Sequence, residues 1–545
     1  MLVPVLTLLG TLTATGTLVY HFDERLPVVR FRLLTTFLVL SSGQLLLYAL
    51  WKVFLKPLCF SPFKHLPKPP LDQWPLWRDH EDGQRGGRAQ VVNVPNKGII
   101  HCRGILNGER LIVSSPTALA KIASDNYTFI KPMAIKLLAG RVLGMGLVLT
   151  ERDEHKQQRK LFLPPFAPKH IRDLYPTFWR KSREVTERMG DEIHATGAGN
   201  GVFEIGEWAA RVALDIITLS TMGKDFGSVR DADAPLAKVY HTVLQPTLGH
   251  VVIAVLKNFL PAQLVEALPL RSNRHQGDAY DTIRGVCRGL LREKKDQLAG
   301  HHLGGKDILS VCLRYEDIAG VDEEEVINQM TTILGAGHET ISVGITWAIY
   351  MLCLHRDWQA RLREEVRATL PSPDRAQESA SSADVERMPL MRAFLEEVLR
   401  WYPPIPMTMR EPLVDTELDG QYVPRGTRIV VPIKAINREE RYWGPDAKRF
   451  SPSRWLKNDR EFNPSGGVSS KYGYLSFMHG PRSCVASEFA RAEMACVVSA
   501  WVGRFDLDLS DERFRDEENM RTSNGNFSGK PLEGLYVRAQ VLEGW

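Results

Sequence analysis

Few cysteines are present in the sequence, and none is paired at a metal-binding spacing. Seven cysteines occur among 545 residues, an odd number, and no two of them form a C-x-x-C motif. A disulfide framework needs a dense, even set of cysteines, and a structural zinc site needs closely spaced ligands. The sequence therefore argues against both kinds of scaffold.

An excess of basic charge is also missing from most of the chain. The sequence has 69 basic and 64 acidic residues, which gives a net charge of +5. The first 70 residues contain seven basic and two acidic side chains, so the remaining 475 carry 62 of each sign. Because a nucleic-acid binder needs a basic surface for the phosphates, we expect no nucleic-acid partner.

Repeats and long Gly/Ser linkers are absent as well. Hydrophobic residues make up 44% of the chain and charged residues 24%, as in ordinary globular proteins. Length alone would suggest about three or four domains, but we expect a single domain over 73–545, mainly α with small β-sheets. Helical patterns cover 176–195, 205–222, 276–299, 323–355 and 384–402, and β-like runs cover 427–431 and 535–537.

Residues 1–60 have the pattern of a membrane anchor. Residues 33–51 form a run of 19 residues without a charge, close to the roughly 20 that cross a bilayer as a helix. Residues 1–20 are also uncharged and could form an additional span, a signal-like hydrophobic segment or an interfacial helix. For either stretch a buried core helix is the alternative. Lysines follow 33–51 and, by the positive-inside rule, hold the downstream body in the cytosol. The proline-rich residues 61–72 predict a stiff hinge.

A cysteine in an unusual local setting is the most informative feature. Cys484 follows a Gly-Pro turn and opens an apparent helix over 485–502. Unpaired N–H groups at a helix start favour a thiolate, which can act as a nucleophile or as a metal ligand. Otherwise a free cysteine is usually a small buried hydrophobe.

The residues before this cysteine carry a family resemblance. Phe477, Gly480, Arg482 and Cys484 form F-x-x-G-x-R-x-C, which resembles the haem-binding loop of the cytochrome P-450 superfamily. Ala486 stands where that family usually has glycine. The resemblance implies the fold of that family and a haem cofactor (heme b) whose iron is bound by the Cys484 thiolate.

An E-x-x-R motif lies upstream of the cysteine at Glu397 and Arg400. The same spacing recurs elsewhere, as at Glu364 and Arg367, so the motif alone predicts only a helical i,i+3 pair. Proline-rich sequence after Arg400 and the later Arg454 provide the context that selects this pair. The resemblance implies that Glu397, Arg400 and Arg454 form a buried network that supports the haem loop.

A third motif lies within the long helical pattern 323–355. The Thr340 hydroxyl can bond the carbonyl of Ala336, and nearby glycines could leave a groove for a small ligand. The resemblance implies that Thr340 and Glu339 relay protons toward the haem iron. The alternative is a glycine-softened packing site. His338 receives no role.

The two carboxylates of a haem need cationic partners inside the protein. His155 and Arg159 share one face of an expected helix, and Arg410 and Arg482 offer two further guanidinium groups. The resemblance implies that these four residues bind the haem propionates. For His155 a solvated surface position is the alternative.

The resemblance implies a monooxygenase that inserts one atom of O₂ into a lipophilic small molecule. Only 61 residues follow Cys484, so we expect electrons from a separate NADPH–cytochrome P-450 reductase. We expect an endoplasmic reticulum membrane anchor, a cytosolic catalytic domain and a role in fungal secondary metabolism, on a terpenoid, polyketide or alkaloid. Two alternatives remain: an isomerase or dehydratase that rearranges a peroxide without a reductase, and a non-catalytic haem- or lipid-binding membrane protein. Substrate contacts are expected from the segments 133–145, 242–254, 333–336, 405–408 and 524–528.

Overall fold

The computed structural model gives the positions of most of the chain after residue 45. The described residues are 35, 39, 42–44, 46–69, 94–104, 107–197, 199–244, 265, 271–299, 305–314, 321–373, 378–523 and 528–545. The predicted span over 1–20 lies outside them, as do part of the span over 33–51 and residues 70–72 of the hinge. Within the described ranges, no helix combines the length and the apolar character that a membrane crossing requires.

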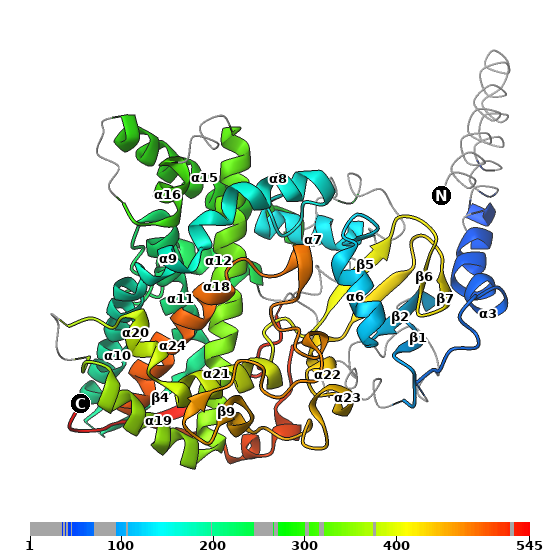
Figure 1. Ribbon diagram of the computed structural model, residues 1–545. Coiled ribbons are helices and arrows are strands. Elements are labelled where there is room, and N and C mark those ends of the chain that lie inside the picture. Colours follow the sequence, from blue (N-terminus) through cyan, green and yellow to red (C-terminus); the bar gives the residue numbers. More distant parts are fainter. Residues whose placement is uncertain are drawn as a thin grey trace.

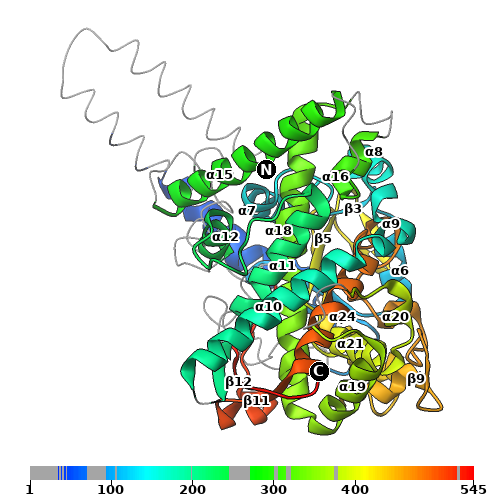
Figure 2. The ribbon, with the colours of Figure 1, turned by 90° about the vertical axis from the view of Figure 1, so that its left-hand side faces the viewer.

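A long helix, α18 (Glu323–Leu354), forms the centre of the helical part of the molecule (Figure 1). The Asp322 side chain caps its first turn, where three glutamates complement the positive end of the helix dipole. Farther along, α18 is buried on nearly all sides, because α11 (Ile205–Met222) and α24 (Ser487–Arg504) pack against it. Helix α10 (Tyr175–Thr196) packs on α24 and α11 and passes in front of α18 in the view of Figure 2.

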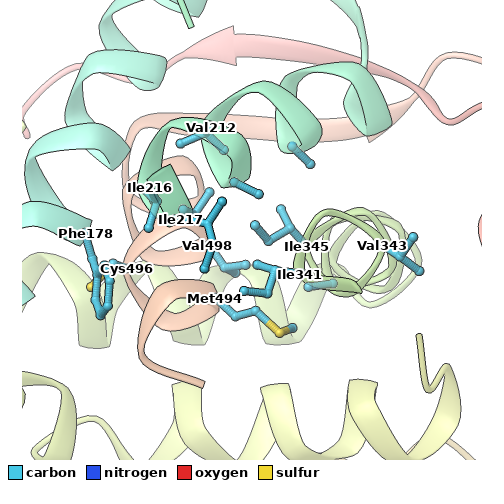
Figure 3. Packing of buried hydrophobic residues seen from close by; sticks show 14 of the residues in the cluster. Phe178, Val212, Ile216, Ile217, Ile341, Val343, Ile345, Met494, Cys496 and Val498 are labelled. Atoms are coloured by element: carbon cyan, nitrogen blue, oxygen red, sulfur yellow. The ribbon is translucent and has the colours of Figure 1, made fainter. Parts of the chain in front are cut away.

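Side chains from three of these helices interlock in the core. Ile217 of α11, Ile341 of α18 and Met494 of α24 gather in one cluster, while Val343 points from the opposite side of α18 (Figure 3). A Cβ atom on Gly337 would lie 2.9 Å from Ile217, so the glycine permits close approach of α18 to α11. The space beside Gly337 that the sequence assigned to a groove is therefore filled by Ile217.

The predicted helix over 384–402 is in fact two helices, and the prediction of one continuous helix was wrong. The first is α20 (Ser382–Glu386), and the second is α21 (Pro389–Trp401). Pro389 lacks an N–H group and disfavours helical geometry at the residue before it, so the chain breaks there. Among the described residues, the other α-helices are α3 (Lys56–Cys59), α6 (Pro116–Ser124), α7 (Met133–Leu143), α8 (Arg152–Phe162), α9 (Pro168–Arg172), α12 (Pro235–Leu244), α15 (Arg271–Ala299), α16 (Ile308–Arg314), α19 (Arg356–Thr369), α22 (Ile433–Ile436) and α23 (Glu440–Trp443).

Small sheets complete the fold, as expected from the sequence. The largest has the strand order β1-β2-β8-β5-β3 and lies on the side of the molecule away from α10 (Figure 1). Its β2–β8 pair is parallel and its other pairs are antiparallel. A three-stranded sheet, β11-β12-β4, and the pairs β6–β7 and β9–β10 are antiparallel. The strands are β1 (Ile99–Arg103), β2 (Glu109–Val113), β3 (Phe129–Ile130), β4 (Asn200–Glu204), β5 (Thr408–Pro412), β6 (Thr416–Leu418), β7 (Gln421–Val423), β8 (Arg428–Val431), β9 (Leu456–Lys457), β10 (Glu461–Phe462), β11 (Phe505–Leu509) and β12 (Tyr536–Val541).

The segment before the sheet lies against β1 and β2. The Asn107 side chain donates to the carbonyl of Val53 at 2.9 Å, and the His101 N–H donates to the carbonyl of Pro67 at 3.0 Å. Phe63 is buried against the His101 ring. The described part of the predicted hinge, 61–69, is therefore packed on the sheet.

Candidate active site

The loop that contains Cys484 is shaped by backbone hydrogen bonds and by a glycine. The Cys484 N–H donates to the carbonyl of Phe477 at 2.9 Å, and the Ser483 N–H donates to the carbonyl of Gly480 at 3.0 Å. Gly480 has φ +76°, and a Cβ atom there would lie 2.5 Å from the carbonyl oxygen of Ala123 in α6. Only glycine meets both conditions without moving α6.

The environment of the Cys484 thiol favours a ligand role over a packing role. Its side chain is accessible, although burial by the surrounding protein raises the pKa of the thiol. The Ala486 N–H group and the positive charges of Arg491 and Arg159 act in the opposite direction and lower that pKa. Cys496, by contrast, is fully buried, and burial raises the pKa of its thiol.

Helix α8 places an arginine directly on the cysteine loop. The two terminal nitrogens of Arg159 donate to the carbonyl and to the hydroxyl of Ser483, at 2.8 and 3.0 Å. His155, one turn earlier, is 2% exposed, so its interpretation as a solvated surface histidine was wrong. Burial, helped by Lys131 and Arg159, lowers the pKa of His155 to about 4, and the imidazole is neutral near pH 7.

A cluster of buried cations consists of Arg410, Arg482 of the cysteine loop and Lys131. Arg410 is 5% exposed, and burial lowers its pKa to about 10. Its hydrogen-bond acceptors among the described residues are neutral: the Thr408 hydroxyl and the Met409 carbonyl. Burial also lowers the pKa of Arg482 to about 10, although Arg482 pairs with Glu151.

Lys131 completes this cation cluster. Burial, together with the charges of Arg410 and Arg482, holds the pKa of Lys131 well below its usual range. Several buried cations with one nearby carboxylate are costly unless an anion joins them. This donor set fits the two carboxylates of a haem, and the accessible Cys484 thiol fits a ligand to its iron.

The structure brings Glu397, Arg400 and Arg454 into one network. Arg400 makes two 2.7 Å bonds to the Glu397 carboxylate, and both side chains are fully buried. Arg454 donates to the same carboxylate at 3.2 Å, as do the Trp455 indole at 2.9 Å and the Ser451 N–H at 2.6 Å. All the acceptor capacity of Glu397 is therefore directed at neighbouring donors.

Asn437, which the sequence did not suggest, joins this network to the cysteine loop. Arg400 donates to the Asn437 carbonyl at 2.8 Å, and the Asn437 side chain accepts from the Leu475 N–H at 2.9 Å and donates to the Ser476 hydroxyl at 2.9 Å. A single asparagine outside any periodic pattern gives no signal in the sequence.

A second link missed by the sequence approaches the loop from α24. Arg491 pairs with Glu396, and its guanidinium carbon lies 4.4 Å from the centre of the Phe477 ring. The Tyr474 hydroxyl donates to the other oxygen of Glu396 at 2.5 Å. The E-x-x-R spacing of Glu488 and Arg491 was the available signal, and that pair lies 3.2 Å apart.

The third motif lies on α18. The Thr340 hydroxyl donates to the carbonyl of Ala336 at 2.9 Å, as expected. Glu339 is 8% exposed and accepts a hydrogen bond from the Ser528 hydroxyl at 2.7 Å. His338 is buried with its ring centre 4.5 Å from that of Tyr240.

The comparisons with known proteins agree with this geometry. The family model for cytochrome P-450 matches residues 104–531. The chain is 98% identical over 545 residues to the cytochrome P-450 monooxygenase buaD of Petromyces alliaceus, and the alignment covers 100% of both chains. It is 36% identical to the monooxygenase sphH of Aspergillus fumigatus, with 94% of each chain covered. It is 34% identical to the monooxygenase FUM15 of Gibberella moniliformis, with 90% of each covered.

Proposed function

The chain belongs to the cytochrome P-450 family of haem-thiolate monooxygenases, and we propose that it oxidises a lipophilic secondary metabolite with electrons from a separate NADPH–cytochrome P-450 reductase. The observation that carries this proposal is the accessible Cys484 thiol, flanked by Arg159 and Arg491, close in sequence to Arg482 of the buried cation cluster. The three relatives described above are fungal and are named monooxygenases, which favours this function over an isomerase or dehydratase.

Each group of residues has a separate task. When bound, the haem supplies the activation of O₂ and the oxidising chemistry. Cys484 holds the iron, and Arg159 and Arg491 favour its thiolate form. Lys131 and Arg410 supply positive charge for the haem carboxylates.

Thr340 and Glu339 have the properties needed to move a proton. Because the Thr340 hydroxyl gives its hydrogen to the Ala336 carbonyl, its oxygen can accept a hydrogen bond from a water that carries the proton. Glu339 is the neighbouring carboxylate and is almost fully buried. A positioned acid beside a hydroxyl is a common way to deliver protons in catalysis.

A lipophilic substrate suits the apolar segments near these residues. Helix α7 (Met133–Leu143) is rich in apolar side chains and packs against α18. Residues 405–408 lead into β5, which carries Arg410. Apolar walls with few polar groups are typical of small-molecule sites, which supports a terpenoid, polyketide or alkaloid substrate.

A membrane location is also part of the proposal. We place the chain on the endoplasmic reticulum membrane, anchored by residues 1–60 with the catalytic domain 73–545 in the cytosol. The support is a set of large apolar side chains that are exposed just after the uncharged run or at its end: Leu46, Leu47, Leu50, Trp51, Leu55, Leu58 and Phe60.

Reconstitution separates the proposed function from its alternative. Purified holoenzyme is mixed with NADPH, with and without NADPH–cytochrome P-450 reductase, and NADPH oxidation is followed. The proposal predicts oxidation that depends on both proteins. Turnover of an organic peroxide to a rearranged product, with no reductase-dependent NADPH oxidation, would support an isomerase or dehydratase instead. The substrate itself is found by comparing metabolites of a deletion strain with those of its parent, where the substrate accumulates and the product is lost.

A further inference from the structure

The carboxylate of Glu339 is bound to a segment near the C-terminus. Its Oε1 atom accepts a hydrogen bond from the Ser528 hydroxyl at 2.7 Å and lies 3.7 Å from the Lys530 ammonium nitrogen. Ser528 is 1% exposed, whereas the Lys530 side chain is 36% exposed. The Glu339 carboxylate therefore contacts both the buried hydroxyl of Ser528 and the ammonium group of Lys530, which is partly exposed to solvent.

This segment is fixed on both sides by backbone groups. The Gly529 N–H donates to the carbonyl of Pro404 at 2.8 Å, and the Trp347 indole donates to the carbonyl of Gly529 at 2.8 Å. The Ser523 N–H donates to the carbonyl of Lys530 at 2.8 Å. Residues 528–530 are thus held between α18 and the chain that follows α21.

The other titratable group beside Glu339 is His338, on α18 itself. His338 is buried and feels the charges of both Glu339 and Lys530, but its Nδ1 atom is engaged with the carbonyl of Leu334 at 3.0 Å. Burial lowers the pKa of His338, so its imidazole is neutral near pH 7. Among the described neighbours, the polar groups that reach the Glu339 carboxylate are therefore Ser528 and Lys530.

We propose that Ser528 and Lys530 are positioning residues for Glu339, which hold its carboxylate in one orientation, from which it takes up a proton and passes it toward Thr340. A nearly buried carboxylate needs hydrogen-bond donors, and the single O–H donor of a serine fixes the direction of the carboxylate oxygen that accepts it. The inference rests on the proposed function, in which Glu339 moves protons. It gives Ser528 a different task from the substrate contact expected for 524–528.

The first experiment measures the hydrogen peroxide formed per NADPH oxidised and needs no added substrate. Holoenzyme and reductase oxidise NADPH in H₂O and in D₂O, and hydrogen peroxide per NADPH is measured for wild type, S528A, K530M and E339Q. We expect S528A and K530M to raise the peroxide yield and to change the solvent isotope effect in the direction of E339Q. K530R, which keeps the charge, should stay close to wild type. Wild-type peroxide yields and isotope effects in S528A and K530M would overturn the inference.

A matched control lies in the same segment. Glu533 pairs with Arg521 at 2.5 Å on the surface. Because no contact joins Glu533 to Glu339 in the described part of the chain, E533Q should match the wild type. Peroxide yields in E533Q as high as those in S528A would show general disturbance of the segment and would contradict a specific role for Ser528.

The decisive comparison is made in the E339Q background. If Ser528 acts through Glu339, the double variant E339Q/S528A should have the peroxide yield of E339Q alone. The same pair is measured by urea unfolding, where residues in contact change the unfolding equilibrium constant non-additively, by about 2- to 160-fold. Additive effects in both measurements would overturn the inference. Absence of reductase-dependent NADPH oxidation in the wild type would instead refute the proposed function itself.

Discussion

Replacing Glu397 with glutamine should strongly destabilise the protein, because its carboxylate is the centre of a buried network. The carboxylate accepts from Arg400 twice and from Arg454, Trp455 and Ser451. In glutamine, an NH₂ group replaces one carboxylate oxygen, so its N–H donors face the donors that this oxygen accepted from. The fully buried Arg400 also loses its counter-charge. Removing one partner of a buried ion pair costs about 3 to 5 kcal/mol, a large part of a total stability of about 5 to 15 kcal/mol.

This loss of stability can be converted into a change in melting temperature. For a chain of this length the unfolding entropy is about 1 kcal/mol/K, so the loss corresponds to a Tm lower by roughly 3 to 5 °C. The assay is thermal unfolding of holoenzyme followed by loss of the Soret band. Because Arg400 and Asn437 connect the network to Leu475, haem release should accelerate as well.

Glu364 provides the matched control. It has the same E-x-x-R spacing to Arg367 but is exposed, and Arg367 donates instead to the carbonyls of Gly503 and Glu543. Glu364→Gln should leave the Tm within about 1 °C, as for most surface substitutions. A Glu397→Gln variant that melts together with Glu364→Gln and the wild type would refute the reasoning.

Three further substitutions probe other parts of the site. Gly480→Ala should lower the stability by about 1 to 3 kcal/mol and speed haem release, because the new Cβ atom collides with Ala123. Gly467→Ala is the control: Gly467 also has a positive φ, +80°, but open space around it, so haem release should change less. Thr340→Ala should keep haem but raise peroxide per NADPH several-fold, whereas Thr340→Ser should stay near wild type. Burial lowers the pKa of His338 in the folded protein below 6.5, the ordinary value for the unfolded chain. As the pH falls through 6.5, the unfolded chain binds a proton at this histidine before the folded protein does, so the wild type loses stability. The Tm advantage of wild type over His338→Gln should therefore be smaller at about pH 5.5 than at about pH 8. Equal advantages would contradict this assignment.

The long helices were predictable from the sequence because their apolar periodicity is strong. The pattern over 205–222 coincides with α11 (Ile205–Met222), and the pattern over 323–355 agrees with α18 (Glu323–Leu354). The pattern over 384–402 failed because periodicity continued across a break that the single residue Pro389 imposes.

Some residues of the candidate site could be recognised from the local sequence, and others only from contacts between distant parts of the chain. The residues around Cys484 lie in one short segment, so their spacing carried the family resemblance. Asn437, Ser528 and Lys530 are isolated polar residues whose partners lie far along the chain. Nothing in the local sequence tells such residues from ordinary surface positions, and only tertiary packing reveals their partners.

The central claim is that Cys484 binds haem iron as a thiolate, and the absorption spectrum of the reduced, CO-bound protein tests it most directly. The spectrum is measured for wild type and for Cys484→Ala, with Cys496→Ala as a control that removes a buried thiol from the core. Wild type and Cys496→Ala should show the Soret band displaced to long wavelength that thiolate ligation produces, and Cys484→Ala should lack it. A wild-type spectrum without that displacement, or a Cys484→Ala spectrum that keeps it, would contradict the assignment.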